Sequence, residues 1–387
     1  MKKNTYFALC PLGLEEILSR ELLAAGAEKT KPTRAGVEFY ATEAAAEYAC
    51  LTSRIASRIL LKLDVSDYYD EEDIYNFACR TKWELYFDAT SSIRVDVTAH
   101  RSPLQSLDFT LLRIKDGICD RFNHFTETRP NVDRARPDAR IFAHIDPTHC
   151  TFYLDLCGEA LFKRGWRRDK GEAPLKENLA AGLLALSGWT ADVPLADLFC
   201  GSGTIPIEAA SIATNMAPGL HRHFLFERFK GFDKDRFEEV REDAKAAVNL
   251  YAPLQIQASD ISSIVVGKAQ ENALCAGLAP LIESGKLAFE VADAREAKPK
   301  VPNSLLVSNP PYGEQSNPKS ASVSSMMKNV ADNLKRNWAP SVAWFLTSDR
   351  TLPREMRLSE ARKIPLFNGP LECRFFRFDL VSGSFRG

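Results

Sequence analysis

The sequence predicts an α/β protein, in which a doubly wound, mostly parallel sheet forms the C-terminal part and a smaller α+β region precedes it. Beyond residue 190, short apolar strands alternate with helical segments, which is typical of a parallel sheet with helices on both faces. The first of these strands leads into the glycine turn "LADLFCGSGT", and two later strands end in aspartate. The first 60 residues instead follow the order of a compact ferredoxin-like unit.

The N-terminal region is expected to be an α+β unit that continues to about residue 160. In "GLEEILSRELLAAG", leucine and isoleucine recur at helical spacing, and Gly26 is a stop signal. We expect strands at 5–10, 36–42, 57–66, 92–99, 139–146 and 148–158. We expect helices at 13–26, 43–53, 71–80 and 106–125.

The C-terminal region begins with a helix expected at 174–189, since Pro174 stands near its start, where a missing N–H costs least. Parallel strands are expected at 193–199, 254–260, 286–292, 304–308 and 341–347. A hairpin at 363–367 and 372–380 would complete a seven-stranded sheet.

The composition narrows the class of protein. Of 387 residues, 45% are hydrophobic and 26% are charged, which is ordinary for a soluble globular protein, and no apolar run is long enough for a membrane span. The start "MKKNTYFALCPLGLEEIL" is interrupted by acidic residues, so we expect no signal peptide. Nine scattered cysteines without a Cys-x-x-Cys pair favour reduced thiols and a cytoplasmic location.

The sequence argues against a metal site and favours a surface that binds a polyanion. His144, His149, Cys150 and Cys157 match no usual zinc spacing, so no metal is predicted. The net charge of −1 argues against a uniformly basic nucleic-acid binder. Two local basic runs still favour a polyanion surface over a solvated loop. They are "RPNVDRARPDAR", with Arg134 and Arg136, and "KRGWRRDK", with Arg164, Trp166 and Arg167.

The glycine turn is the first motif that carries chemistry. An apolar strand ends at Asp197, and Gly201 and Gly203 lead to a helix expected to begin near Thr204. Glycines let a ligand approach the backbone, and the helix start supplies free N–H groups. A dinucleotide fingerprint needs a third glycine, but Pro206 stands there. An acid two residues before the turn suits a ligand with positive charge.

Two further aspartates and one asparagine are expected to reach the same crevice. Asp260 ends the next strand, where a carboxylate can accept from both ribose hydroxyls of a nucleoside, and Asp293 could accept from an adenine amine. Asn309 follows the fourth strand in "LLVSNPPYGEQ". Because the carboxyl ends of parallel strands meet at one edge, these side chains should lie together.

Taken in order, "DLFCGSGT", "SDIS", "ADAR" and "NPPY" resemble the motifs of class I, Rossmann-like S-adenosylmethionine-dependent methyltransferases that modify exocyclic or amide nitrogens. "LFKRGWR" followed by "APLKENLAA" is similar to the THUMP-containing RNA methyltransferases. The whole chain resembles the RlmL-type guanine-N2 methyltransferases of 23S rRNA. The resemblance implies a ferredoxin-like domain at 1–65, a THUMP RNA-binding domain at 66–160 and a catalytic domain at 161–387. Longer members carry a second methyltransferase domain. Since this chain ends at Gly387, we expect a single catalytic domain in it.

The resemblance also implies the cofactor, S-adenosyl-L-methionine, and the residues around it. The implied cofactor-binding residues are Asp197, Phe199, Gly201, Gly203, Thr204, Asp260, Ile261, Asp293, Ala294 and Asn309. The implied catalytic residues are Asn309, Pro310, Pro311 and Tyr312. The basic-run residues Arg134, Arg136, Arg164, Trp166 and Arg167 are expected to contact RNA.

The guanine N2 amine is a poor nucleophile, so catalysis should rest on positioning it in line with the sulfonium methyl. The Asn309 side-chain oxygen and the Pro310 carbonyl can accept from the amine, Pro311 limits the backbone, and Tyr312 would stack on a flipped base. A covalent cysteine route is disfavoured, because Cys200 has no evident base nearby.

Asp197 and Asp260 are 63 residues apart (260 − 197), whereas a βαβ unit needs about 30 residues in all. The excess holds "NMAPGLHRHFLFERFKGFDKDRF". Similar insertions accompany the resembled group, so we expect this segment to face the substrate, with packing inside the protein as the alternative. The same chemistry on tRNA is the second expectation. Adenine in DNA, a protein glutamine, and a non-catalytic RNA-binding role are weaker ones.

Overall fold

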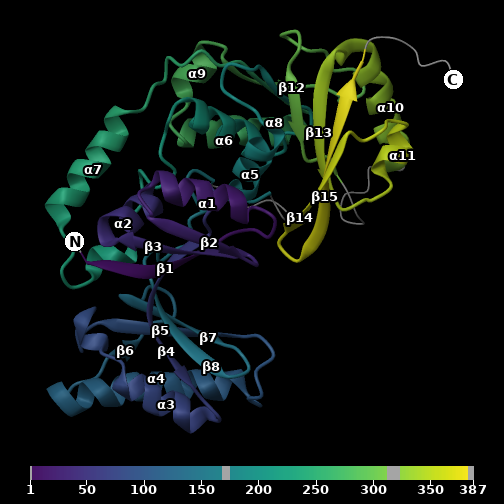
Figure 1. Cartoon of the computed structure of the whole chain (residues 1–387). Helices are drawn as coiled ribbons and strands as arrows, with labels where there is room; N and C mark the ends of the chain where they lie inside the picture. The colour runs from purple at the N-terminus through teal and green to yellow at the C-terminus, as the bar shows by residue number, and fades with distance from the viewer. Residues whose placement is uncertain (1, 168–174, 312–322, 382–387) are drawn as a thin grey trace. The chain divides into compact units, whose positions relative to one another are not determined.

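The computed structural model describes residues 2–167, 175–311 and 323–381. The chain divides into two compact units, each made from separate stretches of sequence (Figure 1). Unit 1 comprises residues 1–9, 19–161 and 222–242, and unit 2 comprises 10–18, 162–221 and 243–387. A single division near residue 160 therefore does not reproduce the compact units. Residues 10–18 precede this point but belong to unit 2, and residues 222–242 follow it but belong to unit 1.

Within the described residues, unit 1 holds a mixed eight-stranded sheet of order β2-β3-β1-β4-β8-β7-β5-β6. Most neighbours pair antiparallel, but β5 runs parallel to both β6 and β7. The strands are β1 (Lys3–Leu9), β2 (Lys29–Thr33), β3 (Gly36–Thr42), β4 (Arg58–Asp67), β5 (Ser92–Ala99), β6 (Asn131–Val132), β7 (Ala139–Ile145) and β8 (His149–Asp155).

Side chains cap the N-termini of several helices of unit 1. They are α2 (Glu43–Thr52), α3 (Glu71–Arg80) and α4 (Leu107–Thr126), while α1 (Glu15–Ala24) crosses the unit boundary. Asp70 caps α3 by accepting from the N–H groups of Glu72 and Asp73, and Ser106 caps α4. Figure 1 shows α3 and α4 side by side. Ile74 and Phe77 of α3 and Ile114 of α4 are buried.

Residues 222–242, which include most of the insertion seen in the sequence, belong to unit 1. They include the short helix η2 (Leu225–Arg228) and most of α7 (Lys234–Ala246). Phe226 donates its N–H to the Leu156 carbonyl at 3.1 Å, and Arg236 pairs with Glu47, a buried carboxylate of α2. Phe224, Phe226 and Phe237 form an aromatic cluster. For these residues, packing inside the protein is the observed arrangement.

Unit 2 contains the seven-stranded, mostly parallel sheet that the sequence predicts. The order along the described strands is β11-β10-β9-β12-β13-β15-β14, and β15 alone runs in the opposite direction to the others. The strands are β9 (Leu195–Asp197), β10 (Ile256–Asp260), β11 (Leu287–Val291), β12 (Leu305–Ser308), β13 (Ser341–Thr347), β14 (Arg362–Asn368) and β15 (Leu371–Leu380). Chain order reverses at β9, so the crevice between β9 and β12 is the switch point of the sheet.

Helices lie on both faces of this sheet. Figure 1 shows α5 (Glu177–Ser187), α6 (Thr204–Ala213) and α8 (Ser263–Cys275) on one side, and α10 (Val323–Asn333) and α11 (Leu352–Met356) on the other. A π-helical turn, Leu334–Trp338, continues α10, and the short α9 (Ala279–Glu283) precedes β11. Leu306, Phe345 and Phe378 from the strands pack against Met327 and Trp338 in one buried cluster.

Candidate active site at the carboxyl ends of the strands

The glycine turn joins β9 to α6 and needs glycine at two positions for different reasons. Gly201 and Gly203 have φ values of +53° and +87°, in the left-handed region that side chains rarely adopt. A Cβ on Gly203 would stand 3.1 Å from the Cβ of Ala269 in α8, so this glycine lets the helix approach. A Cβ on Gly201 would meet no atom within 4 Å, so the turn is open there.

Asp197, at the end of β9, is buried and tied to the strand beside it. Its Oδ1 accepts from Ser308 Oγ at 2.7 Å and from the N–H of Phe199 at 3.1 Å. Burial removes the carboxylate from water and raises its pKa to about 7, and the nearby Asp260 adds to the increase. Such a buried acid gains most from a ligand that brings a positive charge.

Asp260 ends β10 and fixes both its own loop and the glycine turn. One oxygen accepts from the N–H of Gly201 at 3.1 Å, and the other accepts from the N–H of Ser262 at 3.1 Å. Each carboxylate oxygen has two acceptor sites, so lone pairs remain for a ligand. Ile261, the next residue, is 66% exposed, which is unusual for a large apolar side chain at a strand end.

Asp293 follows β11 and is already paired. Arg295 donates from Nε at 2.9 Å to each oxygen of this carboxylate, which holds the pKa of Asp293 below its usual range. A ligand amine would have to share the carboxylate with Arg295. The backbone of buried Ala294 is fixed as well, because its carbonyl accepts from Asn333 of α10 at 2.9 Å.

Asn309 lies directly after β12, beside the strand that carries Asp197. Its side-chain oxygen is buried and has no hydrogen-bond partner among the described residues, which is costly unless a donor arrives with a ligand. Pro310 is buried, and Pro311 is the last described residue of the motif. Tyr312 was expected to stack on a base, and it lies outside the described residues.

The structure corrects the expectation for the run "KRGWR". Arg164 is buried against Glu208 of α6 at 3.2 Å, and Arg167 pairs with Glu177 of α5 at 3.0 Å. Trp166 is buried and lies under the Arg167 guanidinium. These side chains form internal contacts of unit 2 rather than an exposed RNA surface, because two buried glutamates hold the arginines inside.

Arg134 and Arg136 are exposed, as the sequence led us to expect. They lie in the loop before β7, where Asp133 accepts from the N–H groups of Ala135 and Arg136. Arg94 donates to the Arg134 carbonyl at 2.8 Å, so the loop is held from the sheet. Among the described residues, neither guanidinium makes an ion pair, so both are available to an anion.

Two other sites have no support in the described residues. Cys200, the alternative nucleophile, is buried, and burial near Asp197 raises the pKa of its thiol well above the ordinary value. No group of three or more His, Cys, Asp or Glu that could hold a metal is found in 2–167, 175–311 and 323–381. In the same ranges, no helix combines the length and apolarity that crossing a membrane requires.

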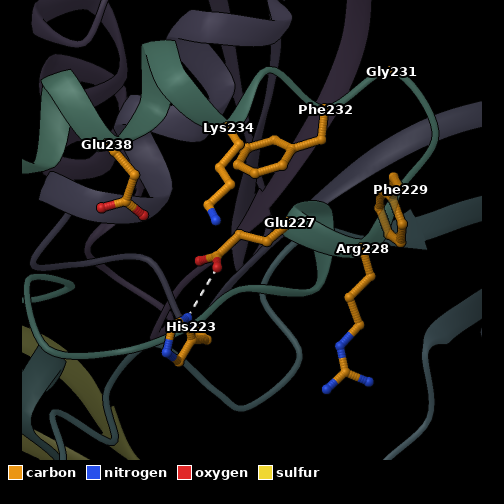
Figure 2. Close-up of a pocket in the computed structure, with 8 residues that line it drawn as sticks. All are labelled: His223, Glu227, Arg228, Phe229, Gly231, Phe232, Lys234 and Glu238. Atoms are coloured by element: carbon orange, nitrogen blue, oxygen red, sulfur yellow. Dashed lines mark hydrogen bonds and ion pairs between the residues drawn. The ribbon is translucent and has the colours of Figure 1, made fainter.

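A separate depression of about 700 Å³ lies in unit 1, on the insertion (Figure 2). Figure 2 shows Glu227 turned toward His223, 2.9 Å away, with Lys234 on the same side and Arg228 pointing away. Phe229, Gly231, Phe232 and Glu238 complete the lining. The depression lies on the insertion, none of the individually predicted site residues lines it, and its mixed charges indicate no particular ligand.

Sequence reasoning missed three residues that shape the crevice: Ser308, Glu177 and Asn272. Ser308 Oγ bridges β12 to β9, and Asn272 of α8 donates to the Ser202 carbonyl at 3.0 Å. Ser308 could have been found, because it is a lone hydroxyl at the end of an apolar strand. Glu177 and Asn272 carry no local signal.

Comparison with known proteins gives three family matches along the chain. Residues 5–60 match the RlmL ferredoxin-like domain, and residues 68–155 match the THUMP domain. Residues 164–377, more than half of the chain, match the RMKL-like methyltransferase domain of family UPF0020.

Curated relatives share the name ribosomal RNA large subunit methyltransferase K/L. The protein of Aeromonas hydrophila is 37% identical over 98% of this chain and 55% of its own length. That of Shewanella amazonensis is 37% identical over 98% of this chain and 54% of its own length. The chain spans about half the length of the curated relatives it matches.

Solved structures agree with this assignment. A Clostridium difficile 630 protein described as a possible methylase has a TM-score of 0.88 at 28% identity, covering 99% of this chain and all (100%) of its own. A proposed methyltransferase solved in complex with SAH has a TM-score of 0.88 at 26% identity, with 99% and 100% covered. With its seven-stranded sheet and the domain matched over 164–377, the chain belongs to the RMKL-like methyltransferase family.

Proposed function

We propose that this protein transfers a methyl group from S-adenosyl-L-methionine to the exocyclic N2 amine of a guanosine in 23S rRNA. One observation carries the chemical part of this proposal. The buried side-chain oxygen of Asn309, which has no hydrogen-bond partner among the described residues, follows β12, next to the strand whose end holds Asp197. An amine acceptor thus lies beside a carboxylate suited to a cationic cofactor, at the switch point where such sheets bind ligands.

The residues at the crevice fit this cofactor. Gly201 leaves open space at the turn, and α6 begins there with no side-chain cap at Gly203 among the described residues. Asp260 keeps lone pairs for ribose hydroxyls, and exposed Ile261 offers an apolar face for an adenine ring. Asp197 would face the amino group of the methionine part. The similar methyltransferase that was solved in complex with SAH supports the same cofactor class.

When bound, S-adenosylmethionine supplies an electrophilic methyl group on its sulfonium. The Asn309 side-chain oxygen and the Pro310 carbonyl accept from the two hydrogens of the target amine. Two acceptors hold the nitrogen pyramidal, so that its lone pair points at the methyl rather than into the ring. The proton of the amine becomes acidic as positive charge develops, so no strong base is required. We assign base stacking to Tyr312.

The choice of 23S rRNA is supported by curated relatives that carry the name ribosomal RNA large subunit methyltransferase K/L. The division into a ferredoxin-like domain (1–65), a THUMP domain (66–160) and a catalytic domain (161–387) belongs to the same proposal. In it, exposed Arg134 and Arg136 of the THUMP part contact RNA phosphates. We also propose a cytoplasmic location, where ribosomal RNA is the available substrate.

The test is methyl transfer from S-adenosylmethionine labelled in the methyl group. The purified protein is incubated separately with 23S rRNA, bulk tRNA and DNA, each from a strain lacking the gene. We expect label in 23S rRNA alone, and nuclease digestion should release it as N2-methylguanosine. Label in tRNA would show that tRNA is the substrate and would leave the proposed N2 methylation standing. Label in DNA adenine, or none in any RNA, would refute the proposal.

A further inference from the structure

Arg167 reaches the glycine turn from a segment outside it and contacts the turn on both sides of one glycine. Its Nη1 donates to Ser202 Oγ at 2.7 Å, and its Nη2 donates to Thr204 Oγ1 at 2.8 Å. Ser202 and Thr204 flank Gly203, the left-handed residue at which α6 begins. One guanidinium therefore spans the last turn of backbone before the helix.

A buried carboxylate fixes the orientation of that guanidinium. Nε of Arg167 donates to Glu177 Oε1 at 3.0 Å, and the two side chains are only 11% and 7% exposed. Nη2 also donates to the Leu175 carbonyl at 3.4 Å. Because guanidinium is planar, fixing Nε and one Nη2 contact also fixes the direction of Nη1.

The turn is intrinsically loose, so these contacts matter. Gly201 and Gly203 lose more conformational freedom on ordering than other residues would. On its other sides, the turn is held by Asn272, which donates to the Ser202 carbonyl, and by Asp260, which accepts from the N–H of Gly201. Arg167 holds the two hydroxyls, and no other contact to the Ser202 or Thr204 hydroxyl occurs among the described residues.

We propose that Arg167 is a positioning residue for the cofactor: oriented by Glu177, it holds Ser202 and Thr204 so that the glycine turn is ordered before the cofactor binds. This inference rests on the proposed function. It replaces the expected RNA contact with a role in the crevice, since four of the five N–H donors of Arg167 are engaged inside the protein. Preorganisation of this kind strengthens binding by lowering its ordering cost.

Two variants separate positioning from general stabilisation, both in the full chain. Arg167→Lys keeps the charge beside Glu177, but a single ammonium cannot reach both hydroxyls in this geometry. Ser202→Ala removes one acceptor and leaves no buried charge unpaired. The matched control is Arg236→Ala, which breaks another arginine–glutamate pair, the one with buried Glu47 in unit 1.

The measurements are the Kd for S-adenosylhomocysteine by calorimetry and the Tm without ligand. We expect about tenfold weaker binding for Arg167→Lys and several-fold weaker binding for Ser202→Ala, since each lost hydrogen bond is worth about 1 kcal/mol. The double variant should be less than additive, because both changes remove the same contact. Arg236→Ala should lower Tm and leave the Kd unchanged.

Wild-type affinity in both variants, whatever their Tm, would overturn the inference and leave the proposed function standing. If Arg167→Lys fails to fold, Ser202→Ala alone decides in the same way. A wild-type protein that binds no S-adenosylhomocysteine would instead refute the proposed function, and this inference with it. In turnover, the KM for the cofactor should rise in the variants while kcat stays near wild type; a fall in kcat alone would contradict a positioning role.

Discussion

Ser308 Oγ donates a 2.7 Å hydrogen bond to Asp197 Oδ1 and accepts one of 3.0 Å from the N–H of Leu198. This hydroxyl joins the end of β12 to the end of β9, immediately before Asn309. The residue proposed to bind the target amine is therefore attached, through its neighbour, to the carboxylate proposed to face the cofactor. Both groups should respond when this one side chain is changed.

For Ser308→Ala, we expect weaker cofactor binding, by about tenfold, because Asp197 loses a hydrogen bond to its charged form. Turnover should fall as well, since Asn309 is no longer held from β9. The measurements are the Kd by calorimetry and kcat with saturating RNA. Ser308→Thr, which retains the hydroxyl, is the control and should recover most of both values. Equal affinity in wild type and Ser308→Ala would contradict the link.

Cofactor affinity should depend on pH through Asp197, whose pKa is raised to about 7. Below that pH the carboxyl is protonated and attracts a cationic amine less, so the Kd should decrease as pH rises from 6 to 8. Asp197→Asn, which cannot ionise, should bind weakly and without this pH dependence. The measurement is the Kd for S-adenosylhomocysteine across that range. A pH-independent wild-type Kd would refute the role.

The same raised pKa fixes the sign of the effect of Asp197 on stability without ligand. The folded protein binds a proton that the unfolded chain, with an ordinary aspartate pKa of about 3.9, has already lost between pH 4 and 7. The contribution of Asp197 to the free energy of unfolding should therefore fall as pH rises through this window. Urea unfolding at pH 5 and pH 7.5 checks this: the stability difference between Asp197→Asn and wild type should shift in favour of the variant at the higher pH.

For Asn309→Ala, we expect turnover to fall by a factor of about 100 or more, because the acceptor for the target amine is lost. Cofactor affinity should stay within about threefold of wild type. Stability should not fall, because the wild-type oxygen is buried without a partner among the described residues. Single-turnover kinetics and calorimetry separate the two effects. Full activity in this variant would show that another group positions the amine.

The two glycines of the turn offer a matched pair. Gly203→Ala should destabilise the protein, since the left-handed conformation costs roughly 1–2 kcal/mol and the new Cβ would stand 3.1 Å from that of Ala269. Gly201→Ala carries the conformational cost alone, because its Cβ would meet nothing. Its added methyl also enters the space proposed for the cofactor, so the Kd of this variant for S-adenosylhomocysteine should rise in addition to the smaller loss of stability. Urea unfolding and calorimetry on both variants would show whether the two effects separate in this way.

The sequence predicted the sheet of unit 2 well because its signals are local. Apolar runs that end near Asp197, Asp260 and Asn309 indicate both the strands and the edge of the sheet where their ends meet. Strand β13 was predicted at its observed bounds. In unit 1, β2 was missed. Its residues "KTKPT" are polar and exposed and include Pro32, so an edge strand of this kind shows no alternating pattern.

The role of the basic run at 163–170 could not be read from the sequence. Charge alone does not say whether an arginine meets solvent, RNA or a glutamate. Arg164 pairs with Glu208, which lies 44 residues away in the sequence, so the two meet only after α6 has folded against the segment of Arg164. Glu208 itself lies within an apolar helix, where a buried carboxylate requires a partner, and this was the one available clue.

Residues 222–242 have a consequence for how the chain is made. Unit 1 needs them, yet they follow its last earlier residue, Leu161, by a gap of 60 residues (161 to 222) that belongs to unit 2. During synthesis, the Glu47 carboxylate of α2 therefore cannot form its ion pair until Arg236 has been made. A fragment that stops at residue 161 should be unstable and prone to aggregation. Exchanging unit 1 between relatives would require three grafts, of 1–9, 19–161 and 222–242, rather than one cut.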